Sequence, residues 1–170
     1  MTAPLWVAVA VAAMACVTDL RVRRIPNWLT FGGAAAGVLA SGAADGWPGV
    51  GSAIGGWALG LALFLPLFLL RGMGGGDVKL LAALGACLGP AATVWLSLYS
   101  ALAGGVLALG VSLARGYSRE AFRNVWGLLT YWRVMGVRPH PALALETSRG
   151  PRLPYSLPIA AGLGMTLWLR

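Results

Sequence analysis

Long runs of apolar residues, separated by short breaks rich in glycine, proline or charge, dominate the chain. A membrane-spanning helix needs about 20 such residues, within a practical range of about 17–25. The pattern therefore predicts an all-α polytopic membrane protein, a single domain over residues 1–170 with six transmembrane helices, the fourth of them short. The predicted spans are 4–18, 28–44, 50–70, 78–89, 91–114 and 153–169.

Glycines four residues apart recur within the predicted spans, at 33 and 37, 51 and 55, 56 and 60, and 85 and 89. This spacing places the glycines of each pair on one face of a helix, where they let two backbones approach closely. We therefore expect a tightly packed bundle.

The composition supports a membrane protein, since 58% of the residues are hydrophobic and only 11% are charged. The net charge of +8 could indicate nucleic-acid binding, but the basic residues cluster in the breaks between apolar runs. Such clusters are typical of loops at an anionic membrane face. We expect the lipid bilayer, and no nucleic acid, as a partner.

The basic residues also predict the orientation. Loops 19–27, 71–79 and 115–152 hold every lysine and arginine except Arg170. By the positive-inside rule these loops face the cytoplasm. The prediction is a multi-pass protein of the bacterial cytoplasmic (inner) membrane, with its N-terminus outside.

Within the last of these loops, residues 118–136 have a helical pattern. Apolar residues recur at steps of three and four at Phe122, Val125, Trp126, Leu129, Trp132 and Met135. This pattern predicts a cytoplasmic amphipathic helix in the headgroup layer. Two roles stay open, a structural anchor and a guide for a substrate helix.

Two of the five acidic residues lie at span ends. Asp19 follows the first predicted span and Asp77 precedes the fourth, both on the predicted cytoplasmic side. Ionisable groups at such positions are candidates for function. The plainer alternative is that each is a helix-end charge, Asp19 paired with Arg21 or Arg23 and Asp77 capping its helix beside Lys79.

Taken together, the two carboxyl groups could perform acid–base chemistry. Two carboxyls in a poorly solvated cleft do not both ionise easily, so they share one proton at intermediate pH. One then activates water and the other donates a proton to the peptide carbonyl. The helix N-terminus favours a negative charge on Asp77, so we expect Asp77 to be the more readily ionised acid.

Three consecutive glycines, Gly74, Gly75 and Gly76, precede Asp77. Glycine adopts dihedral angles closed to other residues and lets another strand come near. We expect this run to shape the loop and admit a substrate strand. Metal binding is not expected, because Cys16 and Cys87 lie inside apolar runs and His140 is the only histidine.

The sequence resembles a known family at three places. Residues 19–27 resemble the D-x-R-…-I-P-N segment of prepilin peptidases, also called type IV leader peptidases, and residues 74–80 resemble their G-x-G-D-x-K motif. Residues 153–160 are similar to the apolar-P-Y-x-x-P-I-A segment that opens the family's last span.

The resemblance implies a G-x-G-D intramembrane aspartic protease with Asp19 and Asp77 as the catalytic pair facing the cytoplasm. The matched positions that it implies for substrate approach and loop shaping are Gly74, Gly75, Gly76, Lys79, Pro26, Asn27, Pro154 and Tyr155. The implied partner is a prepilin or pseudopilin helix with a short basic leader, cut after a glycine, with no cofactor.

One departure concerns a second activity of the family. Longer members carry an insertion with paired C-x-x-C motifs and also N-methylate the new terminus, whereas this sequence starts with its first span and has no such motif. It looks like the short form of Tad/Cpa-type pilus systems, so peptidase activity alone is expected. A non-catalytic membrane scaffold or a proton-coupled small-solute transporter is the alternative.

Overall fold

The computed structural model describes residues 2–136, 138 and 154–169, and the regular structure within them is α-helical. The helices are α1 (Ala3–Val22), α2 (Asn27–Leu69), α3 (Gly75–Leu88), α4 (Pro90–Ala114), α5 (Ser118–Met135) and α6 (Ser156–Trp168). The predicted all-α fold is confirmed for these residues. By length and composition α1, α2 and α4 could each cross a membrane, and α6 is a shorter apolar helix. The number of spans stays a prediction.

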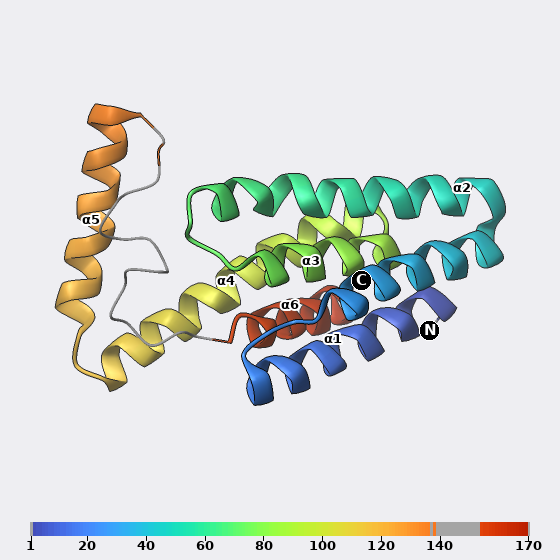
Figure 1. The fold of residues 1–170 in the computed structure, drawn as a ribbon, viewed down its shortest axis with the longest axis horizontal. Helices are drawn as coiled ribbons and strands as arrows, with labels where there is room; N and C mark the ends of the chain where they lie inside the picture. The colour runs from blue at the N-terminus through green and yellow to red at the C-terminus, as the bar shows by residue number, and fades with distance from the viewer. Residues whose placement is uncertain (1, 137, 139–153, 170) are drawn as a thin grey trace.

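The helix α2 contains two of the predicted spans, because it is interrupted at Gly46. This residue has φ 64° and ψ −145°, dihedral angles outside the helical region and readily reached only by glycine. The chain turns back at this point, so the two halves of α2 form a hairpin at the end of the bundle remote from α5 (Figure 1). The expected break at residues 45–48 is therefore a sharp kink between two helices.

The centre of the bundle is α3. Val78 and all residues from Leu80 to Leu88 are buried, and the helix packs against α1, α2, α4 and α6 (Figure 1). A helix that is apolar on all sides is typical of the core of a protein or of a membrane span. Its 14 residues extend about 21 Å, less than the roughly 30 Å thickness of a bilayer core.

Glycines make the contact between α2 and α3 unusually close. A Cβ atom at Gly56 would overlap the carbonyl group of Gly85, and one at Gly85 would overlap that of Gly56. A Cβ at Gly60 would lie 2.9 Å from the Cα of Ala82. The expected close approach is confirmed here but wrong for Gly51, which has no atom within 4 Å of its ideal Cβ position.

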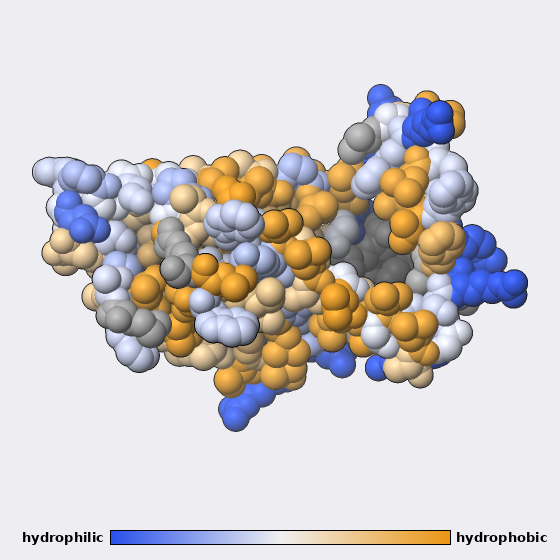
Figure 2. Space-filling model, turned by 180° about the vertical axis from the view of Figure 1, so that it is seen from behind, coloured by the Kyte–Doolittle hydropathy of each residue, from blue (hydrophilic) through white to orange (hydrophobic). Residues whose placement is uncertain are grey.

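The outer surface carries the large apolar side chains, as expected when lipid is the solvent. On α4, Leu102 and Val106 are 57% and 72% exposed, whereas Ser100 and Gly104 are buried toward the bundle. Figure 2 shows hydrophobic residues spread over much of the visible face of the bundle. Small residues inside and large ones outside are typical of helices packed in a membrane.

The helix α5 stands apart from the bundle. Among the described helices it contacts only α4, and it runs across the end of the bundle instead of along it (Figure 1). Its bounds agree with the predicted amphipathic segment to within one residue, and the side chains of Phe122, Trp126 and Leu129 are more than half exposed.

Candidate active site

Asp19 lies within α1, because the helix continues to Val22 beyond the predicted end of the first span at residue 18. The helix ends at Arg23, which has a left-handed backbone (φ 52°) and donates its N–H to the Asp19 carbonyl at 2.9 Å. This extra turn fixes the direction of the Asp19 side chain. Only 9% of Asp19 is exposed, so it faces the interior of the bundle.

Asp77 is the third residue of α3, whose N-cap is Gly74. Its carboxyl group forms a hydrogen bond with the backbone of Gly74. A side chain at this position that reaches back to the N-cap residue resembles one half of a capping box. The structure therefore includes the helix-capping role that the sequence left open for Asp77.

The glycine run does not use the backbone freedom that the sequence led us to expect. Gly74 has φ −73° and ψ 141°, and Gly75 and Gly76 are helical, so none of them has a positive φ. Their small size is used instead. A Cβ at Gly76 would lie 3.3 Å from the Cβ of Ile25, and one at Gly75 would lie 3.2 Å from the ring of Phe68.

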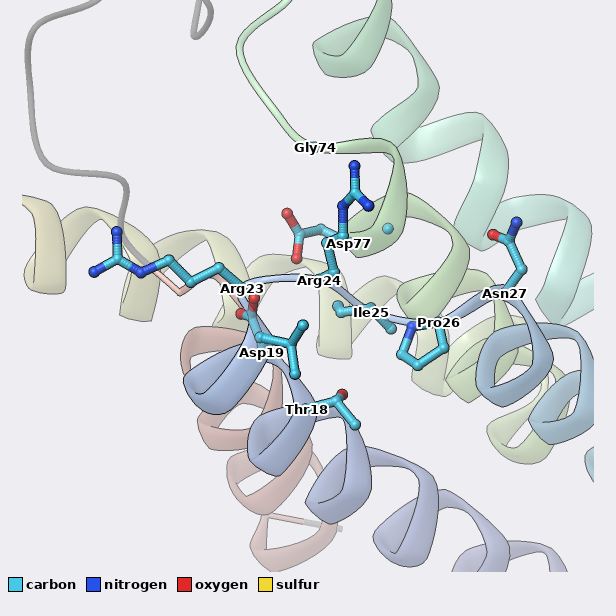
Figure 3. A pocket seen from close by; sticks show the side chains of 11 residues that line it. Thr18, Asp19, Arg23, Arg24, Ile25, Pro26, Asn27, Gly74 and Asp77 are labelled. Carbon is cyan, nitrogen blue, oxygen red and sulfur yellow. The ribbon is translucent and has the colours of Figure 1, made fainter.

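The two acids line one cavity of about 620 Å³. Its other walls are formed by Thr18, Val22, the segment 23–27, Gly74 and Gly76. Figure 3 shows Asp19 at the end of α1 and Asp77 at the start of α3, with the segment 23–27 running between the two helices. Two residues 58 positions apart in the sequence thus open into the same space.

The electrostatic setting of Asp77, which precedes the apolar run 78–89, favours its neutral form. Burial, reinforced by the charge of Asp19 and opposed by the hydrogen bond from Gly74, raises the pKa of Asp77 from 3.8 to about 7. This raised pKa runs against the expectation that the helix N-terminus makes Asp77 readily ionised. Desolvation outweighs the helix dipole.

Asp19 has a partner that sequence reasoning missed. The hydroxyl of Ser156, at the start of α6, donates to Oδ2 of Asp19 at 2.7 Å, and its backbone N–H approaches the same oxygen at 3.4 Å. Ser156 is fully buried. No ion pair joins Asp19 to Arg21 or Arg23 among the described residues. In the sequence, the only sign of this contact is that Ser156 carries a hydroxyl and lies at the same predicted membrane face as Asp19.

Lys79 and Asn27 connect the first two motif segments. The Lys79 Nζ donates to Oδ1 of Asn27 at 3.0 Å and lies 5.5 Å from the centre of the Phe31 ring. Pro26 is the N-cap of α2 and lines the cavity together with Asn27. Lys79 does not line it, so its contact holds the start of α2 against α3.

The third segment lies behind the cavity. Tyr155 packs against α4 so closely that a Cβ at Gly104 would lie 2.6 Å from its Oη. Pro154 and Tyr155 do not line the cavity, and neither does Gly75. Their visible role is to place the start of α6, and with it Ser156, against the end of α1.

The described residues hold no group of three or more histidine, cysteine or acidic side chains that could bind a metal ion. His140 and Glu146 lie outside the described residues. Cys16 and Cys87 are free thiols, and Cys16 donates to the carbonyl of Ser156 at 3.5 Å. The chemistry available in the described cavity is that of two carboxyl groups.

Comparison with protein-family models gives a match to the type IV leader peptidase family over residues 6–109. This range includes both acids, the segment 23–27 and the glycine run, and it ends before α5 and α6. No curated protein and no solved structure matched the chain.

Proposed function

This chain belongs to the type IV leader peptidase family, and from that premise we propose that it is an intramembrane aspartic endopeptidase acting through Asp19 and Asp77. Its substrate would be a prepilin-like protein whose short basic leader is removed after a glycine at the cytoplasmic membrane face. The observation that carries the proposal is the cavity lined by both acids.

The environments of the two acids support different roles. Asp77, with a pKa of about 7, is largely protonated below neutral pH and can then donate to the carbonyl oxygen of the scissile bond. Asp19, which accepts the Ser156 hydrogen bond, would take a proton from the attacking water. As the tetrahedral intermediate collapses, Asp19 would give that proton to the leaving amine, and Asp77 would recover its own proton from the hydroxyl that becomes the new carboxyl group.

We further propose that the cavity faces the cytoplasm of a bacterial inner membrane. The end of the bundle that contains the cavity also contains Arg21, Arg23, Arg24, Arg71 and Lys79, the residues expected on the inner face. A basic leader would remain on that side for the same reason. This topology keeps all six predicted spans and places the N-terminus outside.

In this topology α5 would lie in the cytoplasmic headgroup layer. Figure 2 shows hydrophobic residues on the side of α5 turned to the bundle and strongly hydrophilic ones on the outer side. Arginines at 115, 119, 123 and 133 against one acid, Glu120, match anionic lipid better than a basic leader. A spin label at Phe122 should be accessible to oxygen in the bilayer, and one at Arg123 to a water-soluble quencher. The reverse result would contradict this placement.

The test of the function is cleavage by the full-length chain reconstituted in bilayers. The substrate is a prepilin-like protein with a basic leader, a glycine and a hydrophobic helix. Asp19→Asn and Asp77→Asn should each abolish the shortened product, and Asp45→Asn, an exposed acid outside the cavity, should retain it. Cleavage by either of the first two variants would refute the assignment of the pair.

A further inference from the structure

The carboxyl group of Asp19 is fixed from one side by α6. Its Oδ2 accepts a 2.7 Å hydrogen bond from the Ser156 hydroxyl, in the range of short O–H···O contacts to a charged acceptor. The Ser156 N–H, the first N–H of α6, adds a longer contact to the same oxygen. The other oxygen, Oδ1, has no protein hydrogen bond among the described residues and is free for water or substrate.

Because Ser156 is buried, its hydroxyl donates to Asp19 without competition from water. No part of Ser156 is exposed, so water does not replace the hydroxyl as a donor. A buried hydroxyl beside a carboxylate donates its proton most favourably when the carboxylate is ionised. The N-terminus of α6, a helix of 13 residues, adds the partial positive charge of its unpaired N–H groups.

The other titratable groups near Asp19 come from several elements. They are Asp77 on α3, Cys16 one turn earlier on α1, and Arg23 and Arg24 in the segment that lines the cavity. Of the groups on α6, only Ser156 donates directly to Asp19 among the described residues.

We propose that Ser156 is a positioning residue that orients the Asp19 carboxyl group for its proton transfer with water. The proposal rests on the proposed function. It concerns a position that the family's P-Y-x-x-P-I-A pattern leaves open, since Ser156 occupies the first variable place after Tyr155.

The test compares Ser156→Ala with Ser100→Ala in the full-length chain reconstituted in bilayers. Ser100 is also a fully buried serine, but its hydroxyl has no hydrogen-bond partner within the described part of the chain, and it lies on α4 against Gly162. Ser156→Ala should lower kcat on the order of 10- to 100-fold, the value of a hydrogen bond to a charged group. The loss should fall on kcat and leave KM within about twofold, because the contact orients a reacting group.

Ser100→Ala should change neither kcat nor KM, and Ser156→Thr, which keeps a hydroxyl, should recover most of the wild-type kcat. A Ser156→Thr variant as slow as Ser156→Ala, or a wild-type kcat in Ser156→Ala, would overturn the proposal. If Ser156→Ala does not accumulate in the membrane, Ser156→Cys replaces it. Cysteine keeps a weaker donor, so a kcat equal to that of the wild type would again overturn the proposal.

A second measurement is independent of activity. In full-length protein in nanodiscs, the carboxyl ¹³C resonance of Asp19, assigned with Asp19→Asn, should shift in Ser156→Ala and not in Ser100→Ala. If this shift occurs but the wild type cuts no prepilin-like substrate, the proposed function fails and the contact stands. If the wild type cuts and the resonance does not move, the positioning role is refuted alone.

Discussion

Gly85 lies at the contact through which α2 holds α3, the helix that begins beside Asp77. A Cβ atom at this position would overlap the carbonyl of Gly56, which is backbone and has no rotamer with which to move aside. Gly85→Ala therefore forces α3 away from α2 or tilts it. Because α3 is buried on all sides, the displacement must pass to its neighbours.

The size of the effect follows from the geometry. Inserting one methyl group into a packed interior costs about 1–3 kcal/mol. Relieving this overlap needs a shift of about 1 Å, and Asp77, eight residues earlier on the same rigid helix, lies about 12 Å away along the axis. A misplacement of about 1 Å at reacting groups can lower a rate about 100-fold. We expect Gly85→Ala to lose more in kcat than in thermal stability.

Cleavage in bilayers and thermal unfolding of the same preparations measure the two effects. The matched control is Gly51→Ala, a glycine on α2 with no atom within 4 Å of its ideal Cβ position, where alanine should be neutral or stabilising by up to about 1 kcal/mol. A Gly85→Ala enzyme that cuts within twofold of the wild type would show that the backbone contact does not position Asp77.

Three further predictions concern the cavity. The rate should fall on both sides of a pH optimum. The alkaline limb should lie near pH 7, because Asp77 has a pKa of about 7 and must be protonated to act as the acid. A flat rate between about pH 5 and 9 would contradict the carboxyl pair. Because the pKa of Asp77 is higher in the folded protein than the ordinary value of 3.8, its protonation favours the folded state. This contribution to stability is fully present below pH 3.8 and is lost as the pH rises through about 7. Asp77→Asn should therefore unfold less readily than the wild type at pH 8 by a few kcal/mol at most, at about 1.4 kcal/mol per pKa unit, and the gain should shrink toward pH 4; an equal gain at both pH values would refute burial as the cause. Gly76→Val should impair cleavage more than folding, because a Cβ at this position would already lie 3.3 Å from Ile25. The control Gly72→Val, where the nearest atom to the added Cβ is 3.5 Å away, should cut normally in the same assay. Full activity of Gly76→Val would remove the argument for close approach.

The positions of the helices could be predicted because the bilayer imposes their length. Each predicted span overlaps a helix, and the break at residues 45–48 coincides with the kink at Gly46. The end of α1 was four residues off, because hydropathy detects where apolar residues stop while a helix continues through polar ones. That single extra turn decides whether Asp19 is a surface charge or a buried one.

The details of the site depended on contacts between distant segments, which no local pattern records. Ser156 went unnoticed because its importance comes from the packing of α6 against α1. The pKa of Asp77 is raised although the group lies at a helix N-terminus, because that position is worth about 0.3–1 kcal/mol, less than the cost of burying a carboxylate. The glycine run has ordinary φ angles, and its small volume lies near Ile25 and Phe68, contacts that the sequence alone does not reveal.

The unequal lengths of α3 and α4 have a consequence for where the bond is cut. The two helices meet at Gly89 and run back side by side (Figure 1). The 25 residues of α4 extend about 37 Å against about 21 Å for α3, so α4 continues up to about 16 Å past the start of α3 before α5 begins.

With α5 in the headgroup layer, as proposed, Asp77 lies below that layer, at the edge of the hydrocarbon core. A soluble peptide carrying only the leader and its glycine would then bind without reaching both acids, and efficient cleavage would require the hydrophobic helix that follows. Equal rates for the short peptide and the full substrate would place the acids at the surface and overturn this depth.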